Sequence, residues 1–177
     1  MKFTLAIITV LLSMKLFQVQ AQDGETIRTL TQESMVNNSD GVQIELAWLL
    51  ADPFWEYLIN VNPETANTET GEEFYRIVSE YTIIVVVMAQ SRGNITFTSE
   101  EEMRKGMSLK GQDGKNYEPL KSSDVSAELN MILGIFRPIF GQFLGEMGAN
   151  MQFFVFEKEN KKGGGNIRSS SRARCNT

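Results

Sequence analysis

The fold is decided by residues 81–90, which read YTIIVVVMAQ. The stretch is almost continuously apolar, and most of its residues are β-branched, a side-chain type that suits the pleated surface of a strand. It is too short to cross a bilayer, so the pattern predicts a strand that is buried on both faces. A second strongly apolar run, MQFFVF at residues 151–156, is predicted to be a neighbouring strand.

The N-terminus has the features of an export signal. Lys2 supplies a positive charge, residues 3–12 are apolar, and small residues precede a cleavage site after Ala21. We therefore predict that residues 1–21 are a signal peptide and that the protein is exported to the periplasm or the cell exterior. The alternatives are a buried N-terminal helix and an uncleaved anchor interrupted by Lys15.

The charge of the chain is unevenly distributed. Of its 177 residues, 42% are hydrophobic and 22% are charged, which fits one globular domain with a core of useful size. Residues 22–157 carry 9 basic and 21 acidic side chains, whereas residues 158–177 carry 6 basic and 1 acidic. A body with a net charge of −12 argues against a nucleic-acid-binding face, which needs a basic stripe to neutralise phosphates.

These patterns divide the mature chain into three parts. Residues 22–40 are polar and are interpreted as a flexible leader or an edge segment, and residues 41–157 as a β-rich globular domain. Residues 158–177 are rich in Gly, Ser and Arg and are predicted to be a disordered basic tail. Cys175 is the only cysteine, so no disulfide can form within the chain and the fold must depend on its hydrophobic core.

The first part of the domain mixes strand and helix signals. Residues 42–50 alternate between apolar and polar side chains, which predicts a half-buried strand. Residues 54–61 fit either a strand or a short helix capped by Asp52, and we favour the helix. Residues 62–71 are expected to be a surface loop, and residues 72–80 a two-turn helix leading into the central strand.

The second part contains clearer turn and cap signals. Residues 91–94 are predicted to turn into a short strand at residues 95–98, followed by a helix that Ser99 caps. Asp113 and Gly114 then lie between two short strands, which favours a hairpin with a type I′ turn.

A long helix is predicted over residues 123–148, where apolar side chains recur at helical spacing. Pro138 is expected to kink or break it, because proline removes a backbone hydrogen bond inside a helix. The fold class is therefore α+β: an antiparallel sheet or sandwich core, with a kinked helical insertion before the last core strand at residues 151–156.

Some chemistries are excluded by residue types alone. The chain has no histidine, so imidazole bases, Ser-His-Asp and Cys-His catalysis and His-ligated metals are ruled out. One cysteine cannot form a Cys-based zinc site, and neither phosphate-binding glycine loop is present. We assign no catalytic residue, no cofactor-binding residue and no metal ligand.

Several weaker candidates remain, each with a plainer interpretation. Pairs of carboxylates suffice for acid-base hydrolysis, although acids at helix starts are usually solvated, helix-stabilising charges. A calcium site near Asp113 is too sparse for an EF-hand loop. Four aromatic residues could form a platform for a sugar or peptide, but core packing is favoured. The carboxylate pairs are Glu100 with Glu102, Glu72 with Glu73 and Asp52 with Glu56; the aromatic residues are Trp48, Phe54, Trp55 and Tyr57.

Two further motifs concern the surface. The segments Asn37-Asn38-Ser39 and Asn94-Ile95-Thr96 match the N-glycosylation acceptor pattern, which matters only in a eukaryotic secretory pathway.

The segment DGKNYEPL at residues 113–120 is followed by the helix containing Pro138 and by GEMGANMQFFVF at residues 145–156. Together with residues 81–87, these segments resemble a group of exported bacterial proteins of unknown function. The resemblance implies a β-sandwich-like domain with a helical insertion before the last core strand. It carries over no functional residue. Because such proteins are expected to continue into further strands, the glycine-rich sequence after Phe156 raises the possibility of an altered C-terminus.

These observations favour an exported, non-catalytic binding or structural domain, with an unknown protein or glycan partner, no nucleic acid and no membrane span after signal cleavage. One alternative is a carboxylate-dependent hydrolase. The other is a peripheral envelope or membrane-surface protein that uses the bent helix at residues 123–148.

Overall fold

The computed structural model describes residue 29 and residues 32–111, 113–158 and 174–175. The predicted signal peptide at residues 1–21 lies outside this part of the chain, as do most of the predicted leader and most of the predicted tail. The chain forms two compact units, which subdivide the region predicted as one globular domain. The first contains Leu50–Glu80, and the second contains Met35–Leu49 and the residues from Tyr81 onward.

The first unit is a pair of helices, α3 (Asp52–Val61) and α4 (Glu69–Ser79). The helix predicted over residues 54–61 is confirmed, but Ala51 rather than Asp52 occupies the cap position. Helix α4 begins earlier than expected, because the Thr68 hydroxyl accepts a hydrogen bond from the Gly71 backbone N–H at 3.2 Å. That cap shortens the loop that was predicted over residues 62–71.

Aromatic packing holds the core of this unit. Trp55 is only 1% exposed, and its ring centroid lies 6.0 Å from that of Phe74. Its indole N–H donates a hydrogen bond to the Leu50 carbonyl oxygen at 3.0 Å, so the polar group of this buried side chain is satisfied.

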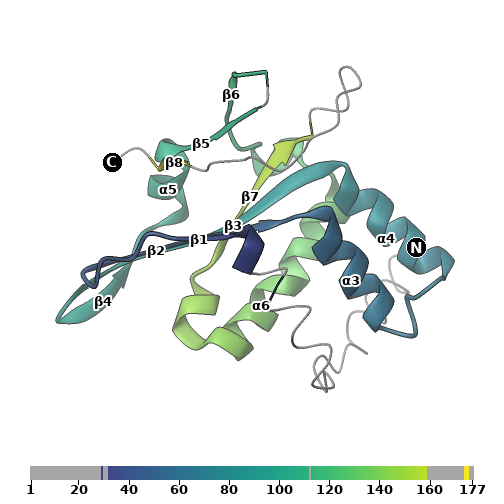
Figure 1. The fold of residues 1–177 in the computed structure, drawn as a ribbon, viewed down its shortest axis with the longest axis horizontal. Coiled ribbons are helices and arrows are strands. Elements are labelled where there is room, and N and C mark those ends of the chain that lie inside the picture. The colour runs from purple at the N-terminus through teal and green to yellow at the C-terminus, as the bar shows by residue number, and fades with distance from the viewer. Residues whose placement is uncertain (1–28, 30–31, 112, 159–173, 176–177) are drawn as a thin grey trace. The chain divides into compact units, whose positions relative to one another are not determined.

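The second unit is built on a five-stranded antiparallel sheet, which confirms the predicted α+β class (Figure 1). The strand order is β1-β2-β3-β4, and β7 also pairs with β3. The strands are β1 (Met35–Asn37), β2 (Gln43–Leu50), β3 (Tyr81–Arg92), β4 (Asn94–Phe97) and β7 (Gln152–Glu157).

The predicted pairing of the two most apolar strands is confirmed. Strand β7 runs antiparallel to the first half of β3, with Ile83 opposite Val155 and Val85 opposite Phe153. The predicted turn at residues 91–94 is wrong in extent. Strand β3 continues to Arg92, and the reversal takes place at Gly93, whose φ of 87° lies in the left-handed region that favours glycine.

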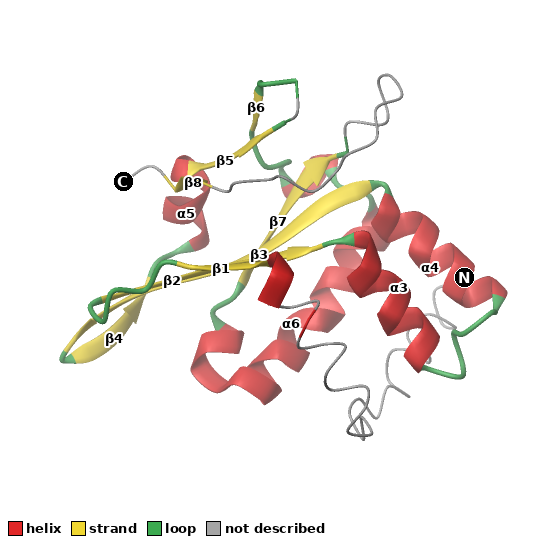
Figure 2. Ribbon diagram, in the orientation of Figure 1, coloured by secondary structure: helices red, strands yellow, loops and turns green. Residues whose placement is uncertain are grey.

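Both faces of β3 are covered, as its sequence predicts. On one face, Ile84 and Val86 form a cluster with Phe154, Phe156 and Met103, which comes from α5 (Glu100–Gly106). The opposite face is covered by α6 (Ala127–Ala149), which contributes buried apolar side chains (Figure 2). They include Leu129, Ile132, Leu133 and Phe136, and the ring of Phe140 lies 5.8 Å from that of Phe153.

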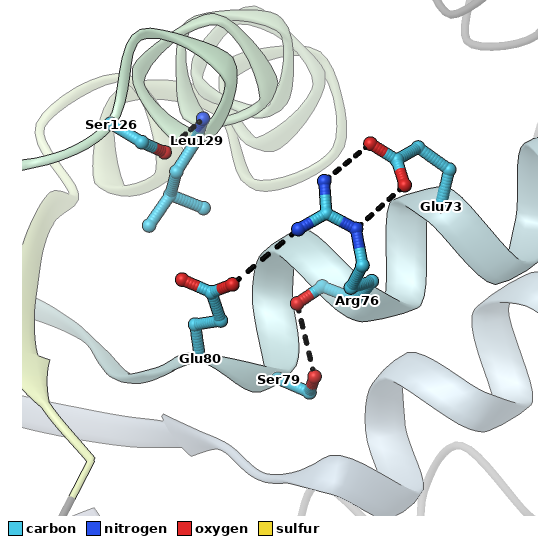
Figure 3. Close-up of polar contacts among 6 residues, drawn as sticks. All are labelled: Glu73, Arg76, Ser79, Glu80, Ser126 and Leu129. Carbon is cyan, nitrogen blue, oxygen red and sulfur yellow. Dashed lines mark hydrogen bonds and ion pairs between the residues drawn. The ribbon is translucent and has the colours of Figure 1, made fainter. Parts of the chain in front are cut away.

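Helix α6 differs from the prediction in its start and in its irregular residue. The 3-10 turn η1 (Ser122–Asp124) precedes it, and Ser126 caps it by accepting a hydrogen bond from the Leu129 N–H (Figure 3). Pro138 lies inside the helix, but the non-helical backbone is at Gly145, with φ 59° and ψ −137°. The helix is interrupted where glycine allows it.

The predicted hairpin is present as β5 (Met107–Lys110) and β6 (Asn116–Tyr117), with Leu109 opposite Tyr117. A type I′ turn needs positive φ at two central residues, and here Gly114 has it whereas Asp113 does not. The predicted turn type is therefore wrong, and a longer loop is closed by a hydrogen bond from the Gly111 N–H to the Lys115 carbonyl at 2.8 Å. The predicted disordered tail contains β8 (Arg174–Cys175), which pairs with β5.

Candidate functional site

The carboxylate pair on α5, Glu100 and Glu102, makes contacts that stabilise this helix. Glu102 and Ser99 form a reciprocal capping box, in which each side chain accepts a hydrogen bond from the other residue's backbone N–H at 3.3 Å. The hydrogen bonds from the Ser99 side chain and backbone lower the pKa of the Glu102 carboxyl. Glu100 is 2.9 Å from the Arg104 guanidinium and 3.9 Å from that of Arg137.

The two carboxylates of the predicted pair on α4, Glu72 and Glu73, lie in different surroundings. Glu73 accepts a hydrogen bond from Arg76 Nε at 2.7 Å, and the same arginine reaches Glu80 at 3.5 Å (Figure 3). The hydrogen bond from Arg76 holds the pKa of the Glu73 carboxyl below its usual range. Glu72 is exposed. Catalysis by a general acid needs a raised carboxyl pKa, so the shift at Glu73 runs in the opposite direction.

The third pair, Asp52 and Glu56, affects the ionisation of Tyr75. The Tyr75 hydroxyl donates a hydrogen bond to Glu56 Oε1 at 3.1 Å. Burial, the negative charge of Asp52 and the contact with Glu56 together raise the pKa of the Tyr75 phenol to about 12. This phenol therefore keeps its proton to a higher pH than an ordinary tyrosine does.

Asp113, the residue considered for calcium, is used inside the hairpin. Its carboxylate accepts hydrogen bonds from the Lys115 N–H at 2.9 Å and the Tyr117 hydroxyl at 3.1 Å, and it lies 2.9 Å from Lys115 Nζ. These contacts, led by the backbone hydrogen bond, lower the pKa of Asp113. The described residues contain no group of three or more acids, cysteines or histidines placed to hold a metal ion.

The four aromatic residues belong to two different compact units, Trp48 to the second and the other three to the first. Trp55 is buried in the first unit with Phe54 at 5.1 Å between ring centroids. Trp48 belongs to the second unit, where its ring lies 5.8 Å from that of Phe140. Core packing, the plainer interpretation, holds for the buried Trp55.

A different candidate site lies at one end of the main sheet, and we call it the sheet tip. It consists of β1, the start of β2, the end of β3 and β4, specifically residues 35–37, 42–46, 89–92 and 94–97. Three large apolar side chains are exposed there: Val36 at 40%, Val42 at 42% and Ile95 at 50%. Single exposed apolar residues are ordinary, so these three mark the sheet tip only as a candidate contact surface.

The sheet tip is held in a defined shape. The Ser91 N–H donates a hydrogen bond to the Val42 carbonyl at 2.7 Å, which joins β3 to the beginning of β2. The Asp40 carboxylate accepts hydrogen bonds from the N–H groups of Gln43 at 2.7 Å and Val42 at 2.9 Å. The same bonds lower the Asp40 pKa. The exposed apolar groups are thus carried on an ordered backbone.

Local sequence patterns do not indicate this site. They predict a turn at residues 91–94, and a turn does not extend a sheet, whereas β3 continues to Arg92. Both glycosylation motifs also lie at the sheet tip: Asn37 ends β1, where its Oδ1 accepts a hydrogen bond from the Ser39 N–H at 3.0 Å, and Asn94 begins β4. Both side chains belong to exposed residues.

Comparison with protein-family models, with curated proteins and with solved structures finds no match to this chain. None of the helices in the described part of the chain has the length and hydropathy needed to span a bilayer.

Proposed function

We propose that this chain is an exported, non-catalytic binding module that presents the sheet tip to its partner. The observation that carries the proposal is the exposure of Val42, directly before β2, and of Ile95 on β4, both beside the end of β3, whose first half is buried. A rigid frame with exposed apolar groups loses little conformational freedom on binding, and such preorganisation favours affinity.

The state of the carboxylates supports a non-catalytic role. Glu73 and Glu102 stabilise their own helices, and the pKa of each is lowered. Export rests on the sequence pattern of residues 1–21.

The test is a thermal-shift and calorimetric screen of the exported protein against a defined panel of oligosaccharides, extended peptides, calcium and anionic vesicles. A ligand that binds only the folded state raises its melting temperature. We expect a saturable shift from an oligosaccharide or a peptide, which disappears in the double variant Val42→Lys, Ile95→Lys.

A matched control is Leu144→Lys, which changes an apolar side chain that is 48% exposed on α6. This variant is expected to bind as the wild type does. Hydrolysis of any panel member, or a shift that the sheet-tip variant leaves unchanged, would contradict the proposal.

A further inference from the structure

Two aspartates of the described chain are each followed directly by a glycine. They are Asp40, before Gly41, and Asp113, before Gly114, and each pair lies in a turn between two strands. A third such pair, at residues 23–24, lies outside the described residues. An aspartate side chain can react with the backbone nitrogen of the next residue, and glycine obstructs that approach least because it has no Cβ. Each pair is therefore a candidate site of spontaneous covalent modification.

The reaction is a dehydration followed by a hydrolysis. The backbone nitrogen of the glycine forms a bond to the carboxyl carbon of the aspartate, and the carboxyl hydroxyl leaves as water with the amide proton. Water then opens the resulting five-membered imide at either of its two carbonyl carbons. One product is the original aspartate. The other is isoaspartate, whose main chain runs through Cβ and Cγ, and water is the only co-reactant.

Both hydrogen bonds that the described chain donates to the Asp40 carboxyl group go to the same oxygen. Asp40 Oδ1 accepts from the backbone N–H groups of Gln43 at 2.7 Å and Val42 at 2.9 Å. The Asp40 N–H in turn donates to the Gln43 carbonyl oxygen at 3.1 Å, which closes the turn between β1 and β2. Asp40 is exposed, so water reaches it.

The Asp113 carboxyl group is held at both of its oxygens. Oδ1 accepts a hydrogen bond from the Lys115 N–H at 2.9 Å. Oδ2 accepts one from the Tyr117 hydroxyl at 3.1 Å and lies 2.9 Å from Lys115 Nζ. Turning the carboxyl carbon toward the Gly114 nitrogen has to break contacts at both oxygens, so the reactive geometry is reached less often. Asp113 is also exposed, so the two sites differ in their contacts and not in their access to water.

The same hydrogen bonds keep both carboxyl groups ionised. Backbone hydrogen bonds, led by Gln43 at Asp40 and by Lys115 at Asp113, lower the pKa of each group. An ionised carboxylate reacts more slowly with the backbone nitrogen than the neutral acid does, because it must lose an oxygen that carries no proton. This effect is common to the two sites, so the contacts at the second oxygen decide between them.

We propose that Asp40–Gly41 isomerises in the folded protein and that Asp113–Gly114 is protected. The protection comes from the Tyr117 hydroxyl and the Lys115 ammonium, which hold Oδ2 of the second aspartate. Isomerisation adds a carbon atom to the backbone of the turn between β1 and β2 and displaces the carboxyl group that orders this turn. The inference goes beyond the proposed function and does not depend on what the sheet tip binds.

The test is peptide mapping by mass spectrometry of the full exported protein, incubated at neutral pH for several weeks either folded or unfolded in urea. Isoaspartate peptides separate from the corresponding aspartate peptides, so each site is measured independently in one sample. We expect faster accumulation of isoaspartate at Asp40 than at Asp113 in the folded protein, and similar rates at the two sites in urea.

The double variant Lys115→Gln, Tyr117→Phe removes both contacts to Oδ2 and keeps the glycine that follows Asp113. Isomerisation of folded Asp113 should rise by roughly two- to tenfold, the factor expected when one hydrogen bond is lost, with no change in urea. Asp40 is the internal control and should react as in the wild type. Tyr75→Phe removes a phenol hydroxyl from a hydrogen bond elsewhere in the chain and should change neither site.

Tyr117→Phe alone keeps the ring of this half-buried residue and should give a smaller rise at Asp113. Isomerisation of folded Asp113 at least as fast as that of Asp40 would overturn the inference. So would an Asp40 that reacts in urea but not in the folded protein, or an Asp113 whose rate is unchanged in the double variant. A parallel rise at both sites would attribute the change to unfolding and would overturn the protection.

Discussion

The backbone N–H of Thr98 lies 2.9 Å from the carbonyl oxygen of Met88, and this hydrogen bond determines which way β4 faces. Because the ladder alternates, the bond turns Thr96 toward β3 and turns Ile95 and Phe97 toward the open edge. A shift of one residue would reverse the arrangement. The register at Met88 therefore defines which backbone groups of β4 face outward at the sheet tip.

The first prediction concerns Gly148. A Cβ atom added there would overlap the carbonyl oxygen of Phe140, so Gly148→Ala forces the end of α6 to move. Overpacking of this kind costs about 1–3 kcal/mol in the free energy of unfolding. Urea denaturation measures the change. Gly134→Ala in the same helix is the control, because nothing lies within 4 Å of its new Cβ, and it should stabilise by about 0.5–1 kcal/mol.

The second prediction concerns Phe154, which is fully buried in β7 and lies under the Arg104 guanidinium. Phe154→Ala leaves a cavity beside β3 and should lower the free energy of unfolding by about 3–5 kcal/mol. Leu144→Ala, on the exposed side of α6, should change it by less than about 0.5 kcal/mol. Equal effects from the two substitutions would contradict the assigned core.

The third prediction concerns the capping box of α5. Ser99→Ala removes the cap and should cost about 1 kcal/mol, measured by urea denaturation at neutral pH. The pKa of Glu102 is lowered in the folded state by its hydrogen bonds with Ser99, so its contribution is present above the unfolded-state pKa.

That contribution is lost as the pH falls through the folded-state pKa of Glu102. The stability difference between wild type and Glu102→Gln should therefore be largest near neutrality and vanish in acid. The control is the same comparison in a Ser99→Ala background, where the hydrogen-bonding side chain is gone and the pH-dependent difference should shrink. A difference that persists unchanged in acid would show that the charge of Glu102 is not involved.

The fourth prediction concerns Tyr75, whose pKa is raised to about 12 by burial, by Asp52 and by Glu56. A raised pKa means that the folded protein retains the phenol proton longer than the unfolded chain does. The associated stability is therefore complete below the ordinary tyrosine pKa of about 10 and is lost as the pH rises toward 12.

Ultraviolet titration of phenolate formation should show one late-ionising tyrosine in the wild type that is absent from Tyr75→Phe. Glu56→Gln should move that late ionisation to lower pH. A late transition that survives in Tyr75→Phe would assign it to another tyrosine.

The local elements were predictable because their signals are local. The β-branched run at residues 81–87 and the aromatic run at residues 153–156 specify buried strands without reference to the rest of the fold. Ser99 and Glu102 form a capping box within four consecutive residues, so the start of α5 could also be predicted from the sequence.

The sheet tip was not predictable in the same way. Nothing in the local sequence of residues 91–94 indicates that β3 continues to Arg92, because that extension depends on pairing with β4 and on the Val42 carbonyl. Likewise, the break in α6 was expected at Pro138 and lies at Gly145, where a conformation available to glycine is used. Which strand forms an edge is decided by long-range pairing, which local sequence patterns do not report.

The most direct measurement is amide hydrogen exchange by nuclear magnetic resonance, on the free protein and on the protein saturated with an oligosaccharide or peptide that raises its melting temperature. In the free protein, the outward amides of Ile95 and Phe97 should exchange rapidly, while the inward amide of Thr96 is protected. The account predicts that the ligand protects the outward amides of the sheet tip at Ile95 and Phe97. Amides at 95 and 97 that exchange equally fast with and without the ligand would contradict it.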